Sequence, residues 1–218
     1  KRGELTAAQS RYLTTLIREE NTLNHLPIEN GLIARSSAML TGWPLPEPTP
    51  EPITLPPKLT LLYHPPAELT ALSDRLQERL AQAGCELEVR FYDGKRWESN
   101  EQFADVDIIL GDRLIGESPE VALENWLRID VLWQAILSDE EQQQCCAVLD
   151  GVQQLADETQ RHHALRDYYT HLMQQSIIMP LFNYQYQISA PPRVEGVTLT
   201  AYGWFDFCRA WVPAPTDE

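Results

Sequence analysis

Charged and aromatic side chains follow three short apolar runs of strand length, and they carry the chemistry that this sequence offers. Tyr63 and His64 close the first run, Asp93 follows the second, and Asp112 and Arg113 follow the third. Arginine binds a phosphate or a carboxylate through two parallel hydrogen bonds. The carboxylate of Asp112 accepts hydrogen bonds from hydroxyl or amino groups. These residue types predict a binding site for a small polar molecule.

Two further observations bear on this candidate site. Tyr184 alternates with polar residues in a later strand-like run, so its side chain is a sixth candidate for contact with the ligand. Loops are polar by default, however, and Asp112 and Arg113 also fit the role of ordinary loop charges. Both interpretations of the loop stay open at this point.

A β-α-β unit is predicted to position these residues. Residues 58–63 and 86–92 are strand-like, leucines at helical spacing fill 68–83, and Gly84 is placed to end that helix. The strands of such a unit are parallel, and residues 106–110 add a third strand. Ligands bind outside the carboxyl ends of parallel strands. The expected fold class is therefore α/β, with a small mainly parallel sheet flanked by helices.

Helical periodicity marks the segments on either side of this unit. The expected helices are residues 6–26 with Thr6 as the cap, a turn or two within 32–40, 119–136, and 140–176. Gly151 and residues 157–158 are candidate breaks in the last of these. A proline-rich strap occupies 43–57, and residues 180–188 and 194–200 are expected to be extended.

Charge and composition exclude several classes of function. The net charge of -15 and the pI near 4.7 oppose direct binding of nucleic acid, whose phosphates attract cations. No apolar run reaches the roughly 20 residues of a membrane-spanning helix. Sequence signatures of hydrolases, nucleotide-binding loops and dinucleotide-binding folds are missing, so no enzymatic activity is predicted. The apolar fraction of 43% is that of an ordinary globular protein.

Cysteine and histidine residues give no pattern typical of a metal or cofactor site. The histidines lack the spacing of a zinc-binding helix, and we expect solvated side chains at His162, His163 and His171. The cysteines suit neither a CxxC pair nor a dense disulfide framework. We expect buried free thiols in a reducing cytoplasm at Cys85, Cys145, Cys146 and Cys208.

Several motifs in this order resemble the second lobe of the family 5 solute-binding proteins, the oligopeptide, dipeptide and nickel group. They are Leu59 to Tyr63, the helix end at 76–84, the run 86–89, and Arg161 to Leu172 followed by 178–182. The aromatic tail Tyr202-Gly-Trp-Phe-Asp-Phe207, followed by Ala210-Trp211, resembles the SgrR-type transcriptional regulators. The loop at 110–117 departs from the longer aromatic loop of the peptide binders, so the resemblance does not carry a ligand type across.

The resemblance implies a function for the whole protein. SgrR-type regulators join a winged-helix DNA-binding domain to a cytoplasmic solute-binding domain and are linked to sugar-phosphate stress. Because the chain begins at Lys1, we expect it to be an internal piece that senses a small metabolite, such as a sugar phosphate. DNA would be bound only through the missing N-terminal domain. A periplasmic binding protein of an ABC importer for peptides or nickel is the alternative.

The resemblance also implies a division of the chain and a partner for its tail. Residues 1–57 would form the helices and strap, 58–196 the α/β core of the second lobe in a type II clamshell, and 197–218 a tail that crosses toward the first lobe. The large aromatic side chains of that tail need a partner surface. We expect the first lobe, or a second copy of the chain, to cover Trp204, Phe205, Phe207 and Trp211.

Overall fold

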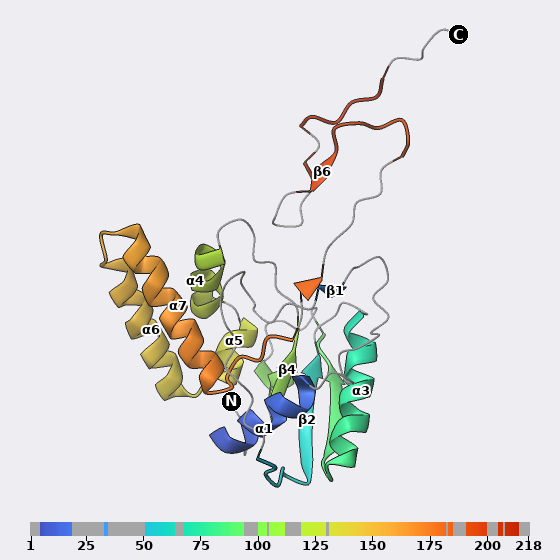
Figure 1. The fold of residues 1–218 in the computed structure, drawn as a ribbon, viewed down its shortest axis with the longest axis vertical. Helices are drawn as coiled ribbons and strands as arrows, with labels where there is room; N and C mark the ends of the chain where they lie inside the picture. Colours follow the sequence, from blue (N-terminus) through green and yellow to red (C-terminus); the bar gives the residue numbers. More distant parts are fainter. Residues whose placement is uncertain are drawn as a thin grey trace.

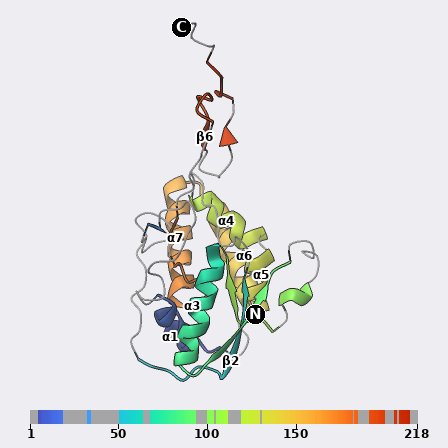
Figure 2. The same cartoon turned by 90° about the vertical axis from the view of Figure 1, so that its right-hand side faces the viewer.

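The computed structural model consists of a body, residues 5 to 184, and a C-terminal arm, residues 191 to 213. Both views show the arm extending away from the body (Figure 1, Figure 2). The structure describes residues 5–18, 33–34, 51–63, 68–93, 100–103, 105–111, 119–129, 131–181, 183–184, 191–199, 205–206 and 208–213.

The predicted β-α-β unit is confirmed and forms the centre of the body. β2 (Lys58–Tyr63) and β3 (Glu86–Phe91) pair in parallel, and α3 (Glu68–Gln82) is the crossover helix between them. β4 (Ile108–Leu110) pairs in parallel with β2, which gives the strand order β3-β2-β4. Gly84 follows α3 with a φ of 77°, a conformation that glycine adopts without steric cost. All three carboxyl ends therefore lie at one edge of the sheet.

Two helices cover one face of this sheet. α1 (Ala7–Arg18) and α3 pack their apolar stripes against β2, and Figure 2 shows the two helices together. The Thr6 side chain caps α1 as predicted, because its hydroxyl accepts a hydrogen bond of 3.2 Å from the Gln9 N–H. Residues 19–26 of the predicted helix lie outside the described residues. The buried side chains of this layer include Leu13, Leu16, Ile17, Leu59, Leu61, Leu72, Leu76 and Leu80.

The opposite face of the sheet is apolar toward its carboxyl edge. Leu62 and Tyr92 pack there against Phe103 of the 3-10 helix η2 (Asn100–Phe103), and the rings of Tyr92 and Phe103 stack with centroids 6.0 Å apart. Ala135 of α5 (Val131–Ile136) adds to this cluster.

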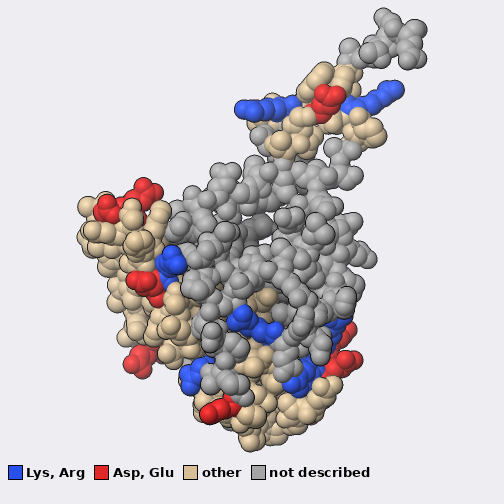
Figure 3. Space-filling view, viewed as in Figure 1, with Lys and Arg blue, Asp and Glu red and all other residues tan. Residues whose placement is uncertain are grey.

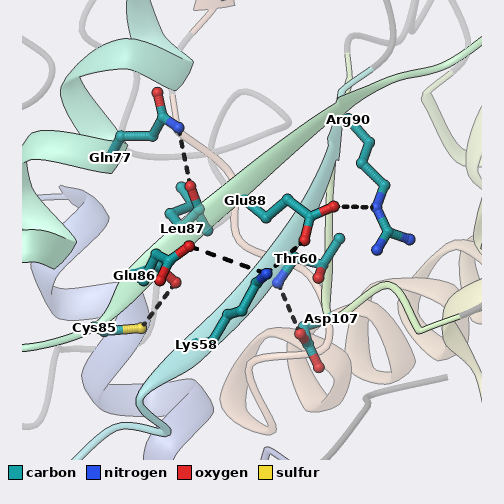
Figure 4. Close-up of polar contacts among 9 residues, drawn as sticks. All are labelled: Lys58, Thr60, Gln77, Cys85, Glu86, Leu87, Glu88, Arg90 and Asp107. Atoms are coloured by element: carbon teal, nitrogen blue, oxygen red, sulfur yellow. Dashed lines mark hydrogen bonds and ion pairs between the residues drawn. The ribbon is translucent and has the colours of Figure 1, made fainter.

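Toward the amino ends of the strands the same face is polar (Figure 4). Glu88 accepts a hydrogen bond of 2.7 Å from Arg90 Nε and lies 2.8 Å from Lys58 Nζ. The hydrogen bond from Arg90, followed by that from Lys58, lowers the pKa of Glu88 to about 2. Asp107 accepts from the Thr60 N–H at 2.8 Å, while its own N–H donates to the Thr60 carbonyl at 3.0 Å. Ion pairs between side chains and a hydrogen bond from the main chain therefore stabilise the charged groups of this half.

A layer of helices flanks the sheet: α4 (Pro119–Ile129), α5, α6 (Asp139–Gln153) and α7 (Glu158–Gln174) (Figure 1). Ser138 and Glu141 form a capping box at the start of α6. The core of this layer contains Leu127, Trp133, Leu137, Cys145, Leu149, Val152, Leu165, Tyr168, Tyr169, Leu172 and Met173. No helix in the described part of the chain is both long enough and apolar enough to cross a membrane.

The predicted helices need two corrections. The single helix expected over 119–136 is two helices, α4 and α5. Of the two breaks expected in the long helical region, the one near Asp157 is confirmed, because residues 154–157 separate α6 from α7 and Asp157 caps α7. The one at Gly151 is wrong, because Gly151 lies inside α6. A glycine costs an exposed helix only about 1 kcal/mol, which the packing of α6 overrides.

Residues 33–34 were predicted within a helical turn, and this prediction was wrong. They form β1 (Ile33–Ala34), which pairs antiparallel with β5 (Asn183–Tyr184). The partner strand is distant in the sequence, so local periodicity gave no sign of it. The rest of the predicted segment 32–40 lies outside the described residues.

The C-terminal arm is a hairpin-like unit. β6 (Thr198–Leu199) pairs antiparallel with β7 (Phe205–Asp206), and Glu195 and Trp211 bridge through two main-chain hydrogen bonds of 2.9 Å. Residues 198–199 confirm the expected extended segment. The Trp211 side chain is 54% exposed, while Trp204 and Phe207 lie outside the described residues. A tryptophan in a core is mostly buried, whereas the described residues of the body leave about half of Trp211 exposed.

Candidate functional site

Three residues lie side by side where the parallel strands end. The register pairs Tyr63 of β2 with Phe91 of β3 on one side and with Leu110 of β4 on the other. Tyr63 and Leu110 are buried, whereas 60% of the Phe91 surface is exposed. The carboxyl edge therefore presents a buried central strand and one uncovered aromatic ring on the outer strand.

Tyr63 is held in place from two directions. Its hydroxyl shares a hydrogen bond of 2.7 Å with the Thr70 hydroxyl of α3. Its ring meets the Phe91 ring in an edge-to-face arrangement, with centroids 5.2 Å apart and an interplanar angle of 81°. Such pairs are favoured by the quadrupoles of the two rings. The Tyr63 hydroxyl is therefore engaged within the protein, and the ring supports Phe91.

Asp93 lies where the chain leaves β3, and the side chain of Gln102 fixes its backbone. Gln102 Oε1 accepts a hydrogen bond of 2.9 Å from the Asp93 N–H, and Gln102 Nε2 donates to the Asp93 carbonyl at 3.3 Å. The preceding Tyr92 N–H donates to the Tyr63 carbonyl at 2.9 Å. The exit of β3 is thus tied both to the central strand and to η2.

The remaining predicted site residues are only partly described. His64, Asp112 and Arg113 lie outside the described residues. The backbone of Tyr184 is placed in β5, opposite Ile33 of β1, and its side chain is outside the description. Of the predicted residues that the structure describes, Tyr63 and Asp93 therefore lie at the carboxyl edge of the sheet. The ligand contacts of all six stay predictions.

Phe91 and Gln102 were not predicted from the sequence. Phe91 shares the alternating pattern of Leu87 and Val89, which is typical of side chains in a core. Phe91 is exposed because it lies at the end of β3, an outer strand of the sheet. The sequence alone does not give the order of the strands, so it could not predict this exposure. No sequence pattern indicated the role of Gln102, because its partner is the main chain of Asp93, and main-chain groups are the same in nearly every residue.

The thiols and histidines differ in their surroundings. Cys85 and Cys145 are buried as predicted, but Cys146 and Cys208 are exposed, so the prediction was wrong for these two. Burial raises the thiol pKa of both Cys85 and Cys145. His163 and His171 are exposed on α7. Among the described residues, no group of three or more potential ligands lies close enough to hold a metal ion.

Comparison with known proteins gives relatives by sequence and by fold, although no family model matches the chain. The chain is 43% identical over 217 residues to the uncharacterized protein YbaE of Escherichia coli K12, covering 99% of the chain and 38% of YbaE. It is 29% identical over 212 residues to the HTH-type transcriptional regulator SgrR of Yersinia pestis, covering 94% of the chain and 36% of that regulator. The chain thus spans well under half the length of these relatives.

Solved structures of solute-binding proteins share the fold. NikA from Brucella suis, in complex with Fe(III)-EDTA, matches 91% of the chain and 46% of its own length, with a TM-score of 0.64 and 14% identity. The oligopeptide-binding protein AppA from Bacillus subtilis, in complex with a nonapeptide, matches 96% and 48%, with a TM-score of 0.61 and 12% identity. The chain is therefore similar in sequence to SgrR regulators and has the α/β fold of the periplasmic-binding-protein type.

Proposed function

We propose that this chain is the ligand-sensing part of a cytoplasmic transcriptional regulator whose DNA-binding domain lies outside these 218 residues. The observation that carries the proposal is the similarity to SgrR regulators over 94% of the chain. The solute-binding fold supports a sensing role, since neighbours with this fold were solved with Fe(III)-EDTA and with a nonapeptide bound. The chain is proposed to act by binding and not by catalysis.

The charge of the chain supports DNA binding elsewhere in the protein. Acidic side chains are spread over α6, α7 and the lower part of the body (Figure 3). The exposed acidic residues of α6, of the cap of α7 and of α7 itself are Asp139, Glu140, Asp150, Asp157, Glu158 and Asp167. Such a surface repels the phosphates of DNA. A separate basic domain is therefore needed for operator binding.

The proposed ligand is a small metabolite such as a sugar phosphate. Tyr63, His64, Asp93, Asp112, Arg113 and Tyr184 are the proposed contacts. Arg113 would bind an anionic group through its guanidinium, and Asp112 would accept hydrogen bonds from hydroxyl groups. Closure of two lobes around the ligand would shift the regulator from one conformation to another. This change would alter how the DNA-binding domain binds its operator.

The C-terminal arm is proposed to complete the clamshell. Its aromatic residues would pack on a first lobe outside this chain, and the exposure of Trp211 supports this role. The division at residues 57 and 196 belongs to the same proposal, with the second lobe between the two points. Association of two copies through the arm is the competing arrangement. Light scattering on the chain with and without residues 197–218 separates the two, because only the competing arrangement predicts a dimer that disappears on truncation.

Calorimetry on this chain and on the full-length protein tests the ligand-sensing function. Glucose 6-phosphate should bind the full-length protein, and binding to the isolated chain should be weak or absent, because a clamshell site uses both lobes. Micromolar binding by the isolated chain would contradict a two-lobed site. The proposed DNA binding is tested by incubating the full-length protein with genomic DNA fragments and sequencing those that it retains. A secretory signal at the start of the full-length sequence would instead favour the importer's binding protein, whose fold is the same.

A further inference from the structure

Phe91 is exposed at a position where its lateral neighbours are buried. Tyr63 and Leu110, which flank the same edge, are 9% and 7% exposed, against 60% for Phe91. A ring of this size normally contributes a large area to a core or an interface. Among the described residues, the carboxyl edge of the sheet therefore keeps the ring of Phe91 in water, at the side where ligands bind in parallel sheets.

Neighbouring residues contact the Phe91 ring on one side and hold the chain just beyond it. The edge-to-face contact with Tyr63 holds it on one side, and the hydrogen bond to Thr70 holds Tyr63 in turn. Two residues further along, the Gln102 amide clamps the backbone of Asp93. A surface whose conformation is already set loses little entropy on binding, which raises affinity.

We propose that Phe91 is a stacking platform for an uncharged ring or an apolar side chain of the ligand. This inference rests on the proposed function, because it assigns a contact in the same site. The face of an aromatic ring carries partial negative charge, so it favours C–H groups and disfavours a phosphate or carboxylate. A sugar phosphate would lay the face of its ring on Phe91 and direct its phosphate away from β3.

The position of Phe91 distinguishes it from other exposed apolar residues. Ile129, which is 73% exposed, is the last residue of α4 in the layer of helices and does not belong to the sheet. Single apolar residues on helix surfaces are common and need no functional explanation. Ile129 therefore serves as a matched control, since its truncation also removes an exposed apolar side chain.

The test uses the full-length protein with three probes: glucose 6-phosphate, glycerol 3-phosphate and the dipeptide Met-Leu. Glycerol 3-phosphate carries the phosphate without a ring, and Met-Leu carries apolar side chains without a phosphate. Affinities are measured by calorimetry for the wild type, Phe91→Ala, Phe91→Tyr and Ile129→Ala. A fluorine label on the ring at position 91, followed by NMR, reports contact with a probe directly.

The expected result is a loss in Phe91→Ala of about tenfold in affinity for the probe with a ring or apolar side chain, equivalent to about 1.4 kcal/mol. Phe91→Tyr keeps the ring and should bind like the wild type, as should Ile129→Ala. The fluorine signal should shift with the same probe and stay in place with glycerol 3-phosphate.

Two outcomes overturn the inference in distinguishable ways. Unchanged binding of a ring-bearing or apolar probe by Phe91→Ala, with no shift of the fluorine signal, removes the platform and leaves the ligand-sensing function standing. Binding of none of the three probes by the wild type removes the proposed ligand classes, and the platform with them. If Phe91→Ala does not fold, Phe91→Leu and the fluorine signal decide between the same outcomes.

Discussion

Gln102 binds the main chain of Asp93 through both atoms of its amide group, at 2.9 and 3.3 Å. A neighbouring strand offers a backbone one donor and one acceptor in the same way. A side chain of η2 thus pairs with the main chain two residues beyond the end of β3, in the place where the ligand site is proposed.

Replacing Gln102 by alanine should loosen this exit from β3. Two hydrogen bonds would be lost, and we expect a decrease of about 1–2 kcal/mol in the free energy of unfolding. Urea denaturation measures this decrease, and hydrogen exchange at the Asp93 amide locates it. Gln153, whose side chain is exposed and donates to Glu124, provides the control: Gln153→Ala should change stability by less than about 0.5 kcal/mol. Equal effects of the two substitutions would argue against a special role of Gln102.

Glu88 should make the stability of the chain depend on pH in the acid range. Hydrogen bonds from Arg90 and Lys58 lower the pKa of Glu88 from 4.5 to about 2 in the folded state. A lowered folded-state pKa means that the stabilisation is complete above about pH 4.5 and is lost as the pH falls toward 2. Urea midpoints measured from pH 7 to pH 3 should therefore fall less steeply for Glu88→Gln than for the wild type. The exposed Glu78 of α3 is the control, and a Glu78→Gln curve identical to that of Glu88→Gln would contradict the assignment.

The four cysteines should divide into two classes when a thiol reagent is added. Cys146 and Cys208 are exposed and should react within the first phase. Cys85 and Cys145 are buried, and burial raises their thiol pKa, so less of the reactive thiolate is present. Titration with an Ellman-type reagent should count two thiols in the folded chain and four in denaturant. Loss of the fast phase in a Cys146→Ser, Cys208→Ser variant confirms which pair reacts.

Two glycine-to-alanine substitutions should act in opposite directions. Gly196 in the C-terminal arm has a φ of 75°, and an added Cβ would overlap the Arg209 carbonyl oxygen. Gly196→Ala should therefore break the bridge between Glu195 and Trp211 and change the fluorescence of the arm. Gly151 lies within α6 with nothing within 4 Å of an added Cβ. Gly151→Ala should raise the melting temperature by stabilising the helix by roughly 0.5–1 kcal/mol.

Leu149 should be one of the costliest positions to truncate in the layer of helices. It is 0% exposed in the cluster formed by α4 to α7. Leu149→Ala should lower the free energy of unfolding by about 2–5 kcal/mol, since a buried leucine leaves a cavity. Its neighbour Val148 is only partly buried, and Val148→Ala should cost clearly less. Calorimetric unfolding of both variants gives the comparison, and equal losses would contradict the described packing.

Local sequence patterns predicted the elements that depend on neighbouring residues. The alternation and periodicity of residues 58–91 gave two strands, the crossover helix and its glycine end. They could not give the pairing of Ile33 with Tyr184, because the partner lies far along the chain. They also could not show that Phe91 is exposed, since that depends on which strand is outermost. The sequence correctly placed Tyr63 and Asp93 at the carboxyl ends of two parallel strands, and their contacts with a ligand stay predictions. The contacts among Tyr63, Phe91, Thr70 and Gln102 could be found only from the structure, because they join side chains of separate elements or a side chain and the main chain.

The pairing of Ile33 with Tyr184 has a consequence for the order of folding. The two residues are separated by about 150 positions, and closing a loop of that length costs entropy that two short strands alone repay poorly. The sheet and the helical layer must therefore bring the two segments together first. β1 and β5 should pair among the last contacts to form, which makes this small sheet a natural reporter of completed folding.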